Sequence, residues 1–590
     1  MKKRFLLLIL ALCALALHSV EYQLPKALFI TSGDGEGYGT VSDGVILSLQ
    51  ELNKSGAFVR LENRQILHFP KKLAQFTILI IPTTFGYHDA DRRYSLSFLS
   101  DVEMQNISAW VKQGGTLVSD VYLGRNRLNG EDRISASNEM TQENWPMAQC
   151  FGVNLIEKNM QNQRIVSSGE GPWQGDITPV YDTPEWTLIP SKLMDRSTRI
   201  LARWFQEKPG EPAITVHPYG AGTAILLATF NLIHPAGDGG FSNGKEIQAF
   251  YHLVYHTAVS QRKYEINLNP WKNGAQSAFC LTLDDGGSPE QYRRILSYIQ
   301  REKIPTTIFS SDDVSPEIVT LLHQNPYITL QSRSHSKPDF RTLSYGETVE
   351  ELLGNSSHFQ TRFAGFRYPF TNNSFWGMKA LDELGFLYDS SIALNHLEFY
   401  RGSLFPYNIP IFQDGYYQSL DLLEISQIFH DDWYYFQDVL TNADYNSEDQ
   451  KRDASRFDAY LQTLWMRGVR PNNGLMVFMG HPLYSGMSSI AMQPLKHMVE
   501  TAREDGAWIT SPDEVAQYWN QLRDQKIDVK EVGPRVSLRM SEVIDGQSFR
   551  LPSRPRSVTF DGEYEIIEQG GAFFLILKKG APQRTVTLEF

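Results

Sequence analysis

The chain has 590 residues, of which 42% are hydrophobic and 21% charged, so it can bury more than one core. Its formal net charge is −12 and it has no basic stripe, which argues against nucleic acid as a partner. It has 3 cysteines, one of them near the N-terminus, so a disulfide framework is not expected.

Residues 1–19 have the form of a secretory signal. Cations at positions 2–4 precede an apolar run over residues 5–17, which is too short to span a bilayer comfortably. Small residues at Ala16 and Ser19 suit cleavage, and an uncleaved membrane anchor is the alternative. We therefore expect an exported protein, periplasmic or secreted, with no membrane span in the mature chain.

Residues 26–262 have the pattern of a separate α/β unit. Apolar runs at residues 27–30 and 76–82 are typical of buried strands, and Ser100 is in position to cap a helix. A glycine-rich stretch, residues 32–39, follows the first run. Because it contains two acids, we expect a plain turn and not a phosphate site.

The sequences at 111–118 and 219–224 resemble class I glutamine amidotransferase-like domains, especially the trimerisation domain of certain β-galactosidases. The resemblance implies a flavodoxin-like α/β fold. Amidotransferases need a nucleophilic cysteine, which the run at residues 116–120 lacks, so we expect a non-catalytic unit that serves assembly or glycan contact. A homo-oligomer formed through this unit is part of that expectation.

Two adjacent carboxylates, Asp284 and Asp285, follow an apolar run over residues 278–283 that is typical of a buried strand. Side chains at the carboxyl end of a strand face the clefts in which α/β enzymes hold their chemistry. Adjacent acids repel each other, so the pair indicates a metal ion or a proton-transfer task. A plain turn is the alternative, since Asp and Gly are ordinary turn formers.

His335 and Asp339 follow a second strand-like run, residues 327–331, and stand four positions apart. Groups at i and i+4 share a face if the backbone turns helically, so both can converge on one cation. Asp285 would be the third ligand, and three protein ligands leave room for water and substrate, as in catalytic metal sites. A surface turn with a solvated histidine is the alternative.

Two later apolar runs each end in a polar side chain, Arg367 in one case and His481 in the other. Ser288, Ser344 and Ser511 begin patterns typical of helix N-termini. Strands and helices therefore alternate, which predicts a parallel sheet closed or nearly closed into a barrel. The motifs would then lie at the carboxyl ends of strands, where a (β/α) barrel holds its active site.

Taken in order, the motifs Thr-Leu-Asp-Asp-Gly, His-Ser-x-x-Asp, Arg-x-Pro-Phe, Tyr-Asp-Ser-Ser and Gly-His-Pro resemble the polysaccharide deacetylase family, carbohydrate esterase family 4. The resemblance covers residues 265–525 and implies a distorted, incomplete (β/α) barrel. The segments at 430–433 and 506–519 resemble the branch with peptidoglycan deacetylase-like and allantoinase-like members.

The resemblance implies a divalent metal ion, with zinc as the first choice, held by Asp285, His335 and Asp339. Most family members have a second histidine where this chain has Asp339. A second anionic ligand lowers the net charge of the site, which weakens the metal as a Lewis acid and favours harder ions.

The resemblance also implies a set of proton-transfer residues: Asp284 as general base, Arg367 as its partner, His481 as general acid, and Asp432 as the candidate for orienting His481. The backbone N–H of Phe370, where many members have tyrosine, would help to stabilise the oxyanion. Asp389 and Trp433 are expected at the substrate. A turn former and a packing residue are their respective alternatives.

Residues 534–590 alternate strand-like runs with glycine and proline turns, which predicts a small β-sandwich. Packing against the barrel is its expected role, and carbohydrate binding is the alternative.

These observations predict an exported, metal-dependent hydrolase that removes N-acetyl groups from an amino-sugar polysaccharide, such as peptidoglycan or a chitin-like glycan, and releases acetate. An allantoinase-like hydrolase of cyclic amides is the alternative within enzymes. A catalytically silent glycan-binding or assembly protein is the alternative from another class, and the departures at Asp339 and Phe370 favour it. The proton-transfer set argues against it, because binding alone needs none.

Overall fold

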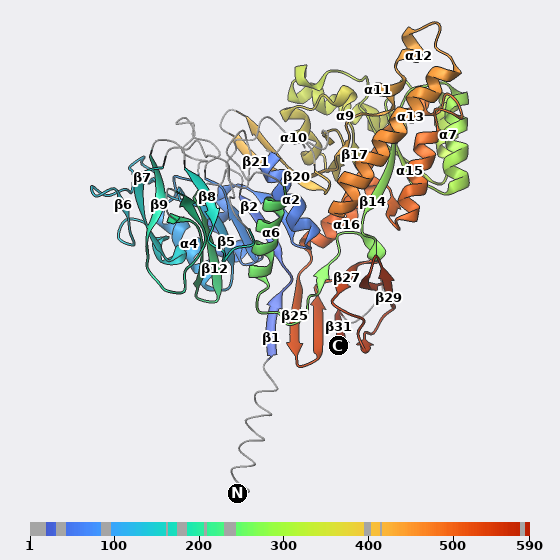
Figure 1. Cartoon of the computed structure of the whole chain (residues 1–590). Coiled ribbons are helices and arrows are strands. Elements are labelled where there is room, and N and C mark those ends of the chain that lie inside the picture. The colour runs from blue at the N-terminus through green and yellow to red at the C-terminus, as the bar shows by residue number, and fades with distance from the viewer. Residues whose placement is uncertain are drawn as a thin grey trace, which may run out of the picture.

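The computed structural model describes residues 19–30, 43–83, 96–160, 163–173, 186–205, 209–228, 244–394, 403–413, 416–578 and 584–590. They form an N-terminal α/β unit, a barrel-like α/β domain and a small β unit that contains the C-terminus (Figure 1). The expected signal segment, apart from Ser19, and the glycine-rich stretch at 32–39 lie outside the described residues.

The N-terminal unit is built on an eight-stranded sheet with the order β3-β2-β4-β5-β12-β11-β10-β8. Its strands are β2 (Lys26–Ile30), β3 (Phe58–Glu62), β4 (Ile78–Ile81), β5 (Thr116–Asp120), β8 (Arg164–Ser167), β10 (Arg199–Phe205), β11 (Pro209–Tyr219) and β12 (Gly222–Leu227). In the sheet, β3, β2, β4, β5 and β12 run parallel, and their chain order is the 2-1-3-4-5 of a doubly wound sheet. Strands β11, β10 and β8 extend the sheet antiparallel. The antiparallel extension was not expected, and the flavodoxin-like assignment stays a prediction.

The other elements of this unit are the helices and a small sheet: α2 (Asp43–Lys54), α3 (Pro70–Leu73), α4 (Asp101–Lys112), α5 (Ala148–Phe151), α6 (Gly244–Ala258), and β6 (Glu139–Met140), β7 (Val153–Asn159) and β9 (Trp186–Leu193). The cap predicted at Ser100 is present. Its hydroxyl accepts a hydrogen bond from the Glu103 backbone N–H at 3.2 Å, and the Glu103 carboxylate accepts one from the Ser100 N–H at 2.8 Å. This reciprocal pair fixes where α4 begins.

The barrel-like domain is built on a sheet with the order β20-β21-β18-β17-β16-β15-β14-β23, and β24 also pairs with β14. Its strands are β14 (Ala278–Asp284), β15 (Thr306–Ser310), β16 (Ile328–Ser332), β17 (Gly365–Phe366), β18 (Tyr388–Asp389), β20 (Tyr407–Gln413), β21 (Tyr416–Glu424), β23 (Leu475–Gly480) and β24 (Trp508–Thr510). All pairs are parallel except β20 with β21. The sheet is a curled half-barrel, so the expected parallel sheet is present and stays open.

The helices of this domain lie between the strands along the chain: α7 (Pro289–Glu302), α8 (Pro316–His323), α9 (Tyr345–Phe359), α10 (Phe375–Glu383), α11 (Asp432–Phe436), α12 (Asp438–Thr441), α13 (Ser447–Thr463), α14 (Pro482–Ser485), α15 (Gln493–Glu504) and α16 (Pro512–Asp524). Ser288, Ser344 and Ser511 cap α7, α9 and α16 as predicted. The first two form full capping boxes.

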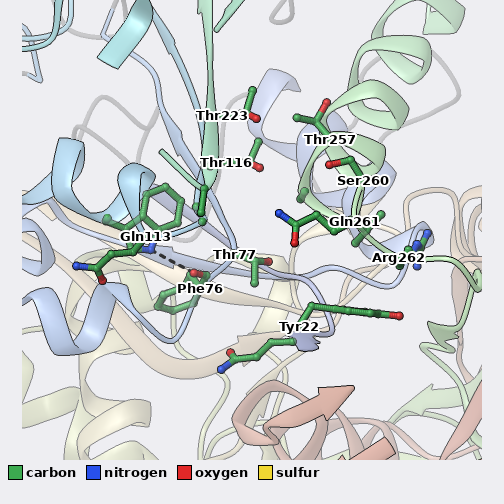
Figure 2. Close-up of a pocket in the computed structure, with 18 of the residues that line it drawn as sticks. Tyr22, Phe76, Thr77, Gln113, Thr116, Thr223, Thr257, Ser260, Gln261 and Arg262 are labelled. Atoms are coloured by element: carbon green, nitrogen blue, oxygen red, sulfur yellow. Dashed lines mark hydrogen bonds between the residues drawn. The ribbon is translucent and has the colours of Figure 1, made fainter. Parts of the chain in front are cut away.

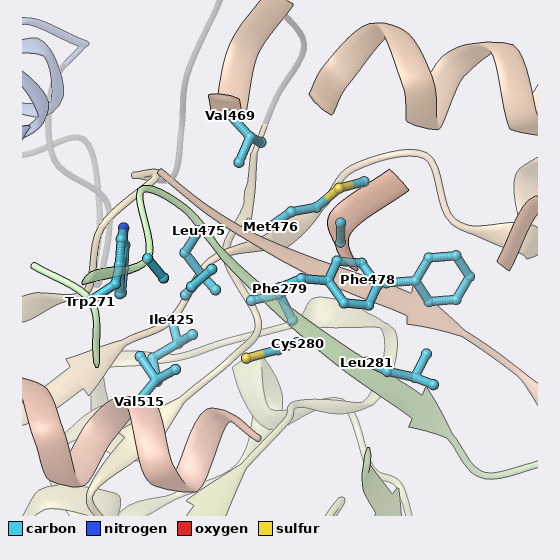
Figure 3. Packing of buried hydrophobic residues seen from close by; sticks show 14 of the residues in the cluster. Trp271, Phe279, Cys280, Leu281, Ile425, Val469, Leu475, Met476, Phe478 and Val515 are labelled. Carbon is cyan, nitrogen blue, oxygen red and sulfur yellow. The ribbon is translucent and has the colours of Figure 1, made fainter. Parts of the chain in front are cut away.

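The core of the barrel lies along β14, whose seven residues are all buried. Phe279, Cys280 and Leu281 pack there with Phe478 of β23 and Val515 of α16 (Figure 3). Full burial of such side chains stabilises the fold by roughly 1.5–3 kcal/mol each. Cys280 is a buried free thiol that packs as a small apolar residue.

The C-terminal β unit is assembled from three separate parts of the chain. One sheet has the order β1-β25-β26-β31-β28 and the other β13-β27-β30-β29. The strands are β1 (Ser19–Gln23), β13 (Asn267–Leu268), β25 (Ile527–Val532), β26 (Arg535–Met540), β27 (Ser548–Leu551), β28 (Ser557–Thr559), β29 (Tyr564–Gln569), β30 (Ala572–Leu577) and β31 (Thr585–Glu589). The unit therefore begins before residue 534 and includes β1 and β13, which the sequence did not predict. The sandwich assignment stays a prediction.

The N-terminal unit contacts the barrel directly. The Phe58 ring lies 4.8 Å from the Trp519 ring of α16, and the Ser419 hydroxyl of β21 donates to the Leu61 carbonyl at 2.7 Å. Buried aromatic packing across this contact couples the two units. In the part of the chain that the structure describes, no helix is both long and apolar enough to cross a membrane.

Candidate functional site

Four charged side chains meet at the carboxyl edge of the half-barrel sheet. Asp284 ends β14, Arg333 follows β16, Arg367 follows β17 and His481 follows β23. In the sheet register Asp284 lies opposite Phe309 of β15, and the preceding Leu283 lies opposite Gly480. The site is therefore at the strand ends, where the sequence predicted it.

The predicted ion pair between Asp284 and Arg367 is present and fully buried. An Arg367 Nη1 donates to Asp284 Oδ1 at 2.8 Å and to the Thr282 hydroxyl at 3.0 Å. Its Nε donates to the Ser390 carbonyl at 2.7 Å, and its guanidinium lies 4.2 Å from the centre of the Phe309 ring. Because these contacts fix the Arg367 side chain, it holds Asp284 in place.

Asp285 is surrounded by cations and donors. Arg333 Nη1 lies 2.7 Å and Lys337 Nζ 3.1 Å from its Oδ1. The Ser311 N–H donates to its Oδ2 at 2.8 Å, and the Ser311 hydroxyl donates to the same oxygen. Arg333 also reaches Asp284, with Nη2 3.1 Å from Oδ2. One guanidinium thus bridges the two adjacent carboxylates.

Burial by itself would raise the pKa of both carboxyls. For Asp284, the guanidinium groups of Arg333 and Arg367 outweigh burial and hold the pKa below its ordinary value. For Asp285, Arg333 and Lys337 do the same. Both groups are therefore ionised and neutralised by fixed side-chain cations.

His481 contacts Asp432, the residue expected to orient it. Its Nδ1 lies 2.8 Å from Asp432 Oδ1, so the other ring nitrogen is left for chemistry. Burial would lower the pKa of His481, but the carboxylates of Asp432 and Asp284 outweigh it and raise the pKa above the ordinary value. The imidazole is thus biased toward the protonated form that a general acid needs.

Asp431, Asp432 and His481 are the one group of three potential metal ligands that converges among the described residues. Asp432 Oδ2 already accepts from the His481 N–H at 2.8 Å and the Ser485 N–H at 3.1 Å. Asp431 caps α11, accepting from the Tyr434 N–H at 3.2 Å, and burial raises its pKa to about 7. These contacts fit a carboxylate that orients His481 better than a metal centre.

The three expected metal ligands do not come together. The His335 imidazole pairs with Asp312 and is half exposed, while Asp339 forms a two-pronged ion pair with Arg341, at 2.6 and 2.9 Å. Neither has a contact with Asp285. The residues that reach Asp285 are instead Arg333 and Lys337, which have the same four-residue spacing but stand two positions earlier in the chain.

The expected substrate residues differ in position. Asp389 is fully buried beside Glu424, accepts from the Ser391 hydroxyl at 2.7 Å, and burial raises its pKa to about 6. Substrate contact through Asp389 is therefore not supported. Phe370 and Trp433 are exposed, by 69% and 49%, so both can meet a ligand.

The sequence did not predict Arg333 and Lys337 at the site, because metal ligands are acids and histidines and these two residues are bases. The signal was present, since Arg333 directly follows the strand β16, and Lys337 stands four residues later. The sequence did not predict Asp431 as a neighbour of His481 either.

A separate cavity of about 420 Å³ lies at the amino-terminal end of β5 and β12 in the N-terminal unit. Figure 2 shows amides and hydroxyls around it, including Gln113, Thr116 and Gln261. Arg262 also lines it, but its guanidinium donates to the Asn267 side chain at 2.7 Å. Glu21 of β1 lines it as well, so the cavity combines neutral hydrogen-bonding groups with charged ones.

Comparison with known proteins gives one family match. Residues 272–387 match the family model for polysaccharide deacetylase. This part of the chain thus carries a polysaccharide deacetylase domain, which suggests N-deacetylation of a polysaccharide. A comparison with curated proteins finds no match.

Solved structures similar to this chain include three with TM-scores of 0.33 to 0.34. A Mycobacterium smegmatis protein named as a polysaccharide deacetylase has TM-score 0.34 and 19% identity, covering 42% of this chain and 92% of that one. Puue allantoinase has 0.33 and 15%, covering 43% and 93%. A Pseudomonas aeruginosa PAO1 protein named as a polysaccharide deacetylase has 0.33 and 14%, covering 43% and 94%. Values this low carry no argument about function.

The deacetylase family is generally metal-dependent, and the residues present here do not fit a metal at Asp285. A divalent ion needs anionic or neutral ligands with free lone pairs. Asp285 instead meets two cations, and neither guanidinium nor ammonium can donate a lone pair.

Proposed function

We propose that the barrel domain binds an N-acetylated polysaccharide without a divalent metal ion at Asp285, and that it is silent as a metal-dependent deacetylase. One observation carries this proposal: Arg333 and Lys337 both contact Asp285 and supply the positive charge that a metal would supply.

Exposed aromatic side chains beside the site support glycan binding. Phe429, Trp433 and Tyr434 are exposed by 49%, 49% and 44%, and the His430 ring stacks on Tyr434 at 4.1 Å. They flank Asp431 and Asp432 in the chain, and Asp432 holds His481. Aromatic faces of this kind pair an apolar surface with polar neighbours, as carbohydrate rings require.

N-deacetylation is the second candidate, and the retained Asp284–Arg367 and His481–Asp432 pairs favour it. In that reaction Asp284 takes a proton from water, the oxygen adds to the acetamide carbonyl, and His481 protonates the nitrogen as the C–N bond breaks. Acetate and a free amine result. It ranks second because Asp284 is fully buried beneath Arg333, with a pKa held low, which makes it a weak and inaccessible base.

We also propose that the protein is exported. Export, periplasmic or secreted, is supported by the cations at 2–4 and the apolar run at 5–17. An envelope glycan follows from export. Hydrolysis of a small cyclic amide has no feature of the described site in its favour.

The test measures binding and turnover on the same purified chain. Affinity for N-acetylglucosamine oligomers and peptidoglycan is measured beside acetate release, with and without chelator. We expect binding that chelator does not change and that Trp433→Ala weakens, with no acetate released. Acetate release that chelator abolishes would overturn the proposal. Release that survives chelator but is lost in Asp284→Asn would establish the second candidate, and absence of glycan binding would refute both.

A further inference from the structure

Two histidines that could bind a metal ion lie on α6, far along the chain from the barrel motifs. His252 and His256 stand four residues apart, so both project from one face of the helix. Their Nε2 atoms face each other at 2.8 Å, and their ring centres are 4.0 Å apart. Two imidazole nitrogens thus converge on one point.

The pair lines a cavity of about 740 Å³ between the N-terminal unit and the C-terminal β unit. Helices α2 and α6 form one side of it, and residues from β27 and β30 form the other. Two carboxylates, Glu51 and Glu265, line the same cavity. Glu51 bonds to Gln248, one turn before His252, and Glu265 Oε1 lies 3.9 Å from His256 Nδ1.

The two rings cannot both be protonated at this separation, because one nitrogen must accept where the other donates. Burial lowers the pKa of His256, and the neighbouring His252 lowers it further. The His256 imidazole is therefore biased toward the neutral form, which is the form that binds metal ions. His252 is exposed and His256 partly so, and an ion can reach them from solvent.

We propose that His252 and His256 bind one divalent transition-metal ion, such as Zn²⁺, through their Nε2 atoms. Two nitrogens about 2.0–2.1 Å from one tetrahedral zinc ion stand roughly 3.3 Å apart, so the pair opens by about 0.5 Å when it binds. Glu265 on the far side of His256 would fix its tautomer, as carboxylates do behind metal-bound histidines. Water completes the coordination.

The test titrates Zn²⁺ into the chelator-stripped full chain by calorimetry. His252→Ala and His256→Ala should each weaken binding at least tenfold. His497→Ala is the matched control, because His497 is a half-exposed histidine paired with Asp458 elsewhere, and it should leave binding unchanged. Equal affinity in the wild type and both α6 variants, or no binding at 1 mM Zn²⁺, would overturn the proposal.

Zinc-edge X-ray absorption on the wild-type chain gives a second readout that needs no variant. Two imidazole ligands are expected, and fewer would contradict the site. Asp432→Asn separates this site from the barrel: loss of zinc in that variant, with retention in His252→Ala, would place the ion at His481 instead. Glycan binding should not change in either α6 variant, so the two proposals fail independently.

Discussion

Arg333→Met tests whether a fixed cation holds the two buried carboxylates together. Arg333 lies 2.7 Å from Asp285 and 3.1 Å from Asp284, and its side chain is 11% exposed. Removing one partner of a buried ion pair destabilises a protein by about 3–5 kcal/mol. Arg367 and Lys337 still contact one carboxylate each, so we expect the lower end, roughly 3 kcal/mol, which is a loss of about 6–12 °C in Tm for a domain of this size.

The loss should depend on pH. In the wild type the pKa values of Asp284 and Asp285 lie below their ordinary values, so the stability they contribute is present above the ordinary pKa of 3.8 and is lost as pH falls through the folded values. Arg333→Met removes most of this contribution. The difference in stability between wild type and variant should therefore be full at pH 7 and shrink toward pH 3.

Thermal unfolding followed by near-UV circular dichroism, from pH 3 to pH 8, measures both effects. Arg341→Met is the control, since Arg341 pairs with Asp339 at 2.6 Å but is 58% exposed. Exposed pairs contribute about 0–1 kcal/mol, so its Tm should hardly change. If Arg333→Met behaved like this control at neutral pH, the fixed-cation account of the site would be wrong.

Three further variants test other parts of the reasoning. The double substitution Arg333→His and Lys337→His places two imidazoles beside Asp285. We expect this variant, made in a His252→Ala background, to gain about one zinc ion per chain in a metal analysis. An unchanged zinc content would count against the geometry described for Asp285. Trp433→Ala should weaken glycan binding by about tenfold, worth roughly 1.4 kcal/mol, in affinity electrophoresis, with Tm unaltered. Burial raises the pKa of Asp513 to about 6. The contribution of Asp513 to the free energy of unfolding is therefore fully present below pH 3.8, the ordinary pKa, and is lost as pH rises through 6. Asp513→Asn should gain up to about 3 kcal/mol relative to wild type between pH 4 and pH 8 in urea unfolding, and an unaltered pH profile would refute this.

Local patterns allowed much of the fold to be predicted. The apolar run before Asp284 is β14. Ser288 and Ser344 cap helices because the serine hydroxyl accepts from the N–H three residues later, while the Gln or Glu side chain there accepts from the serine N–H. The strand β1 could not be predicted. It pairs with β25 from the other end of the chain, and sheet partners are chosen by tertiary packing, which the local sequence does not encode.

Two contacts of the candidate site were predicted. The resemblance of the ordered motifs implied the contacts of Arg367 with Asp284 and of Asp432 with His481, and both contacts are present. The ligand positions were not predictable, because the i, i+4 spacing fits residues 333 and 337 as well as residues 335 and 339. The backbone decides between them: Ser334 and Lys337 adopt positive φ values of 75° and 55°, and this turn directs Lys337 to Asp285 and His335 to Asp312.

The positive charge around Asp284 and Asp285 could be predicted only in part. Adjacent buried carboxylates require positive charge nearby, and this requirement follows from the sequence alone. It does not say whether a metal ion or a side chain supplies that charge. At Asp284 and Asp285 the supply is Arg333, Lys337 and Arg367, all covalently part of the chain. A metal can leave and return, whereas these cations are permanent, so the buried acidic pair is a fixed part of the barrel domain and, under the proposed function, not a metal site.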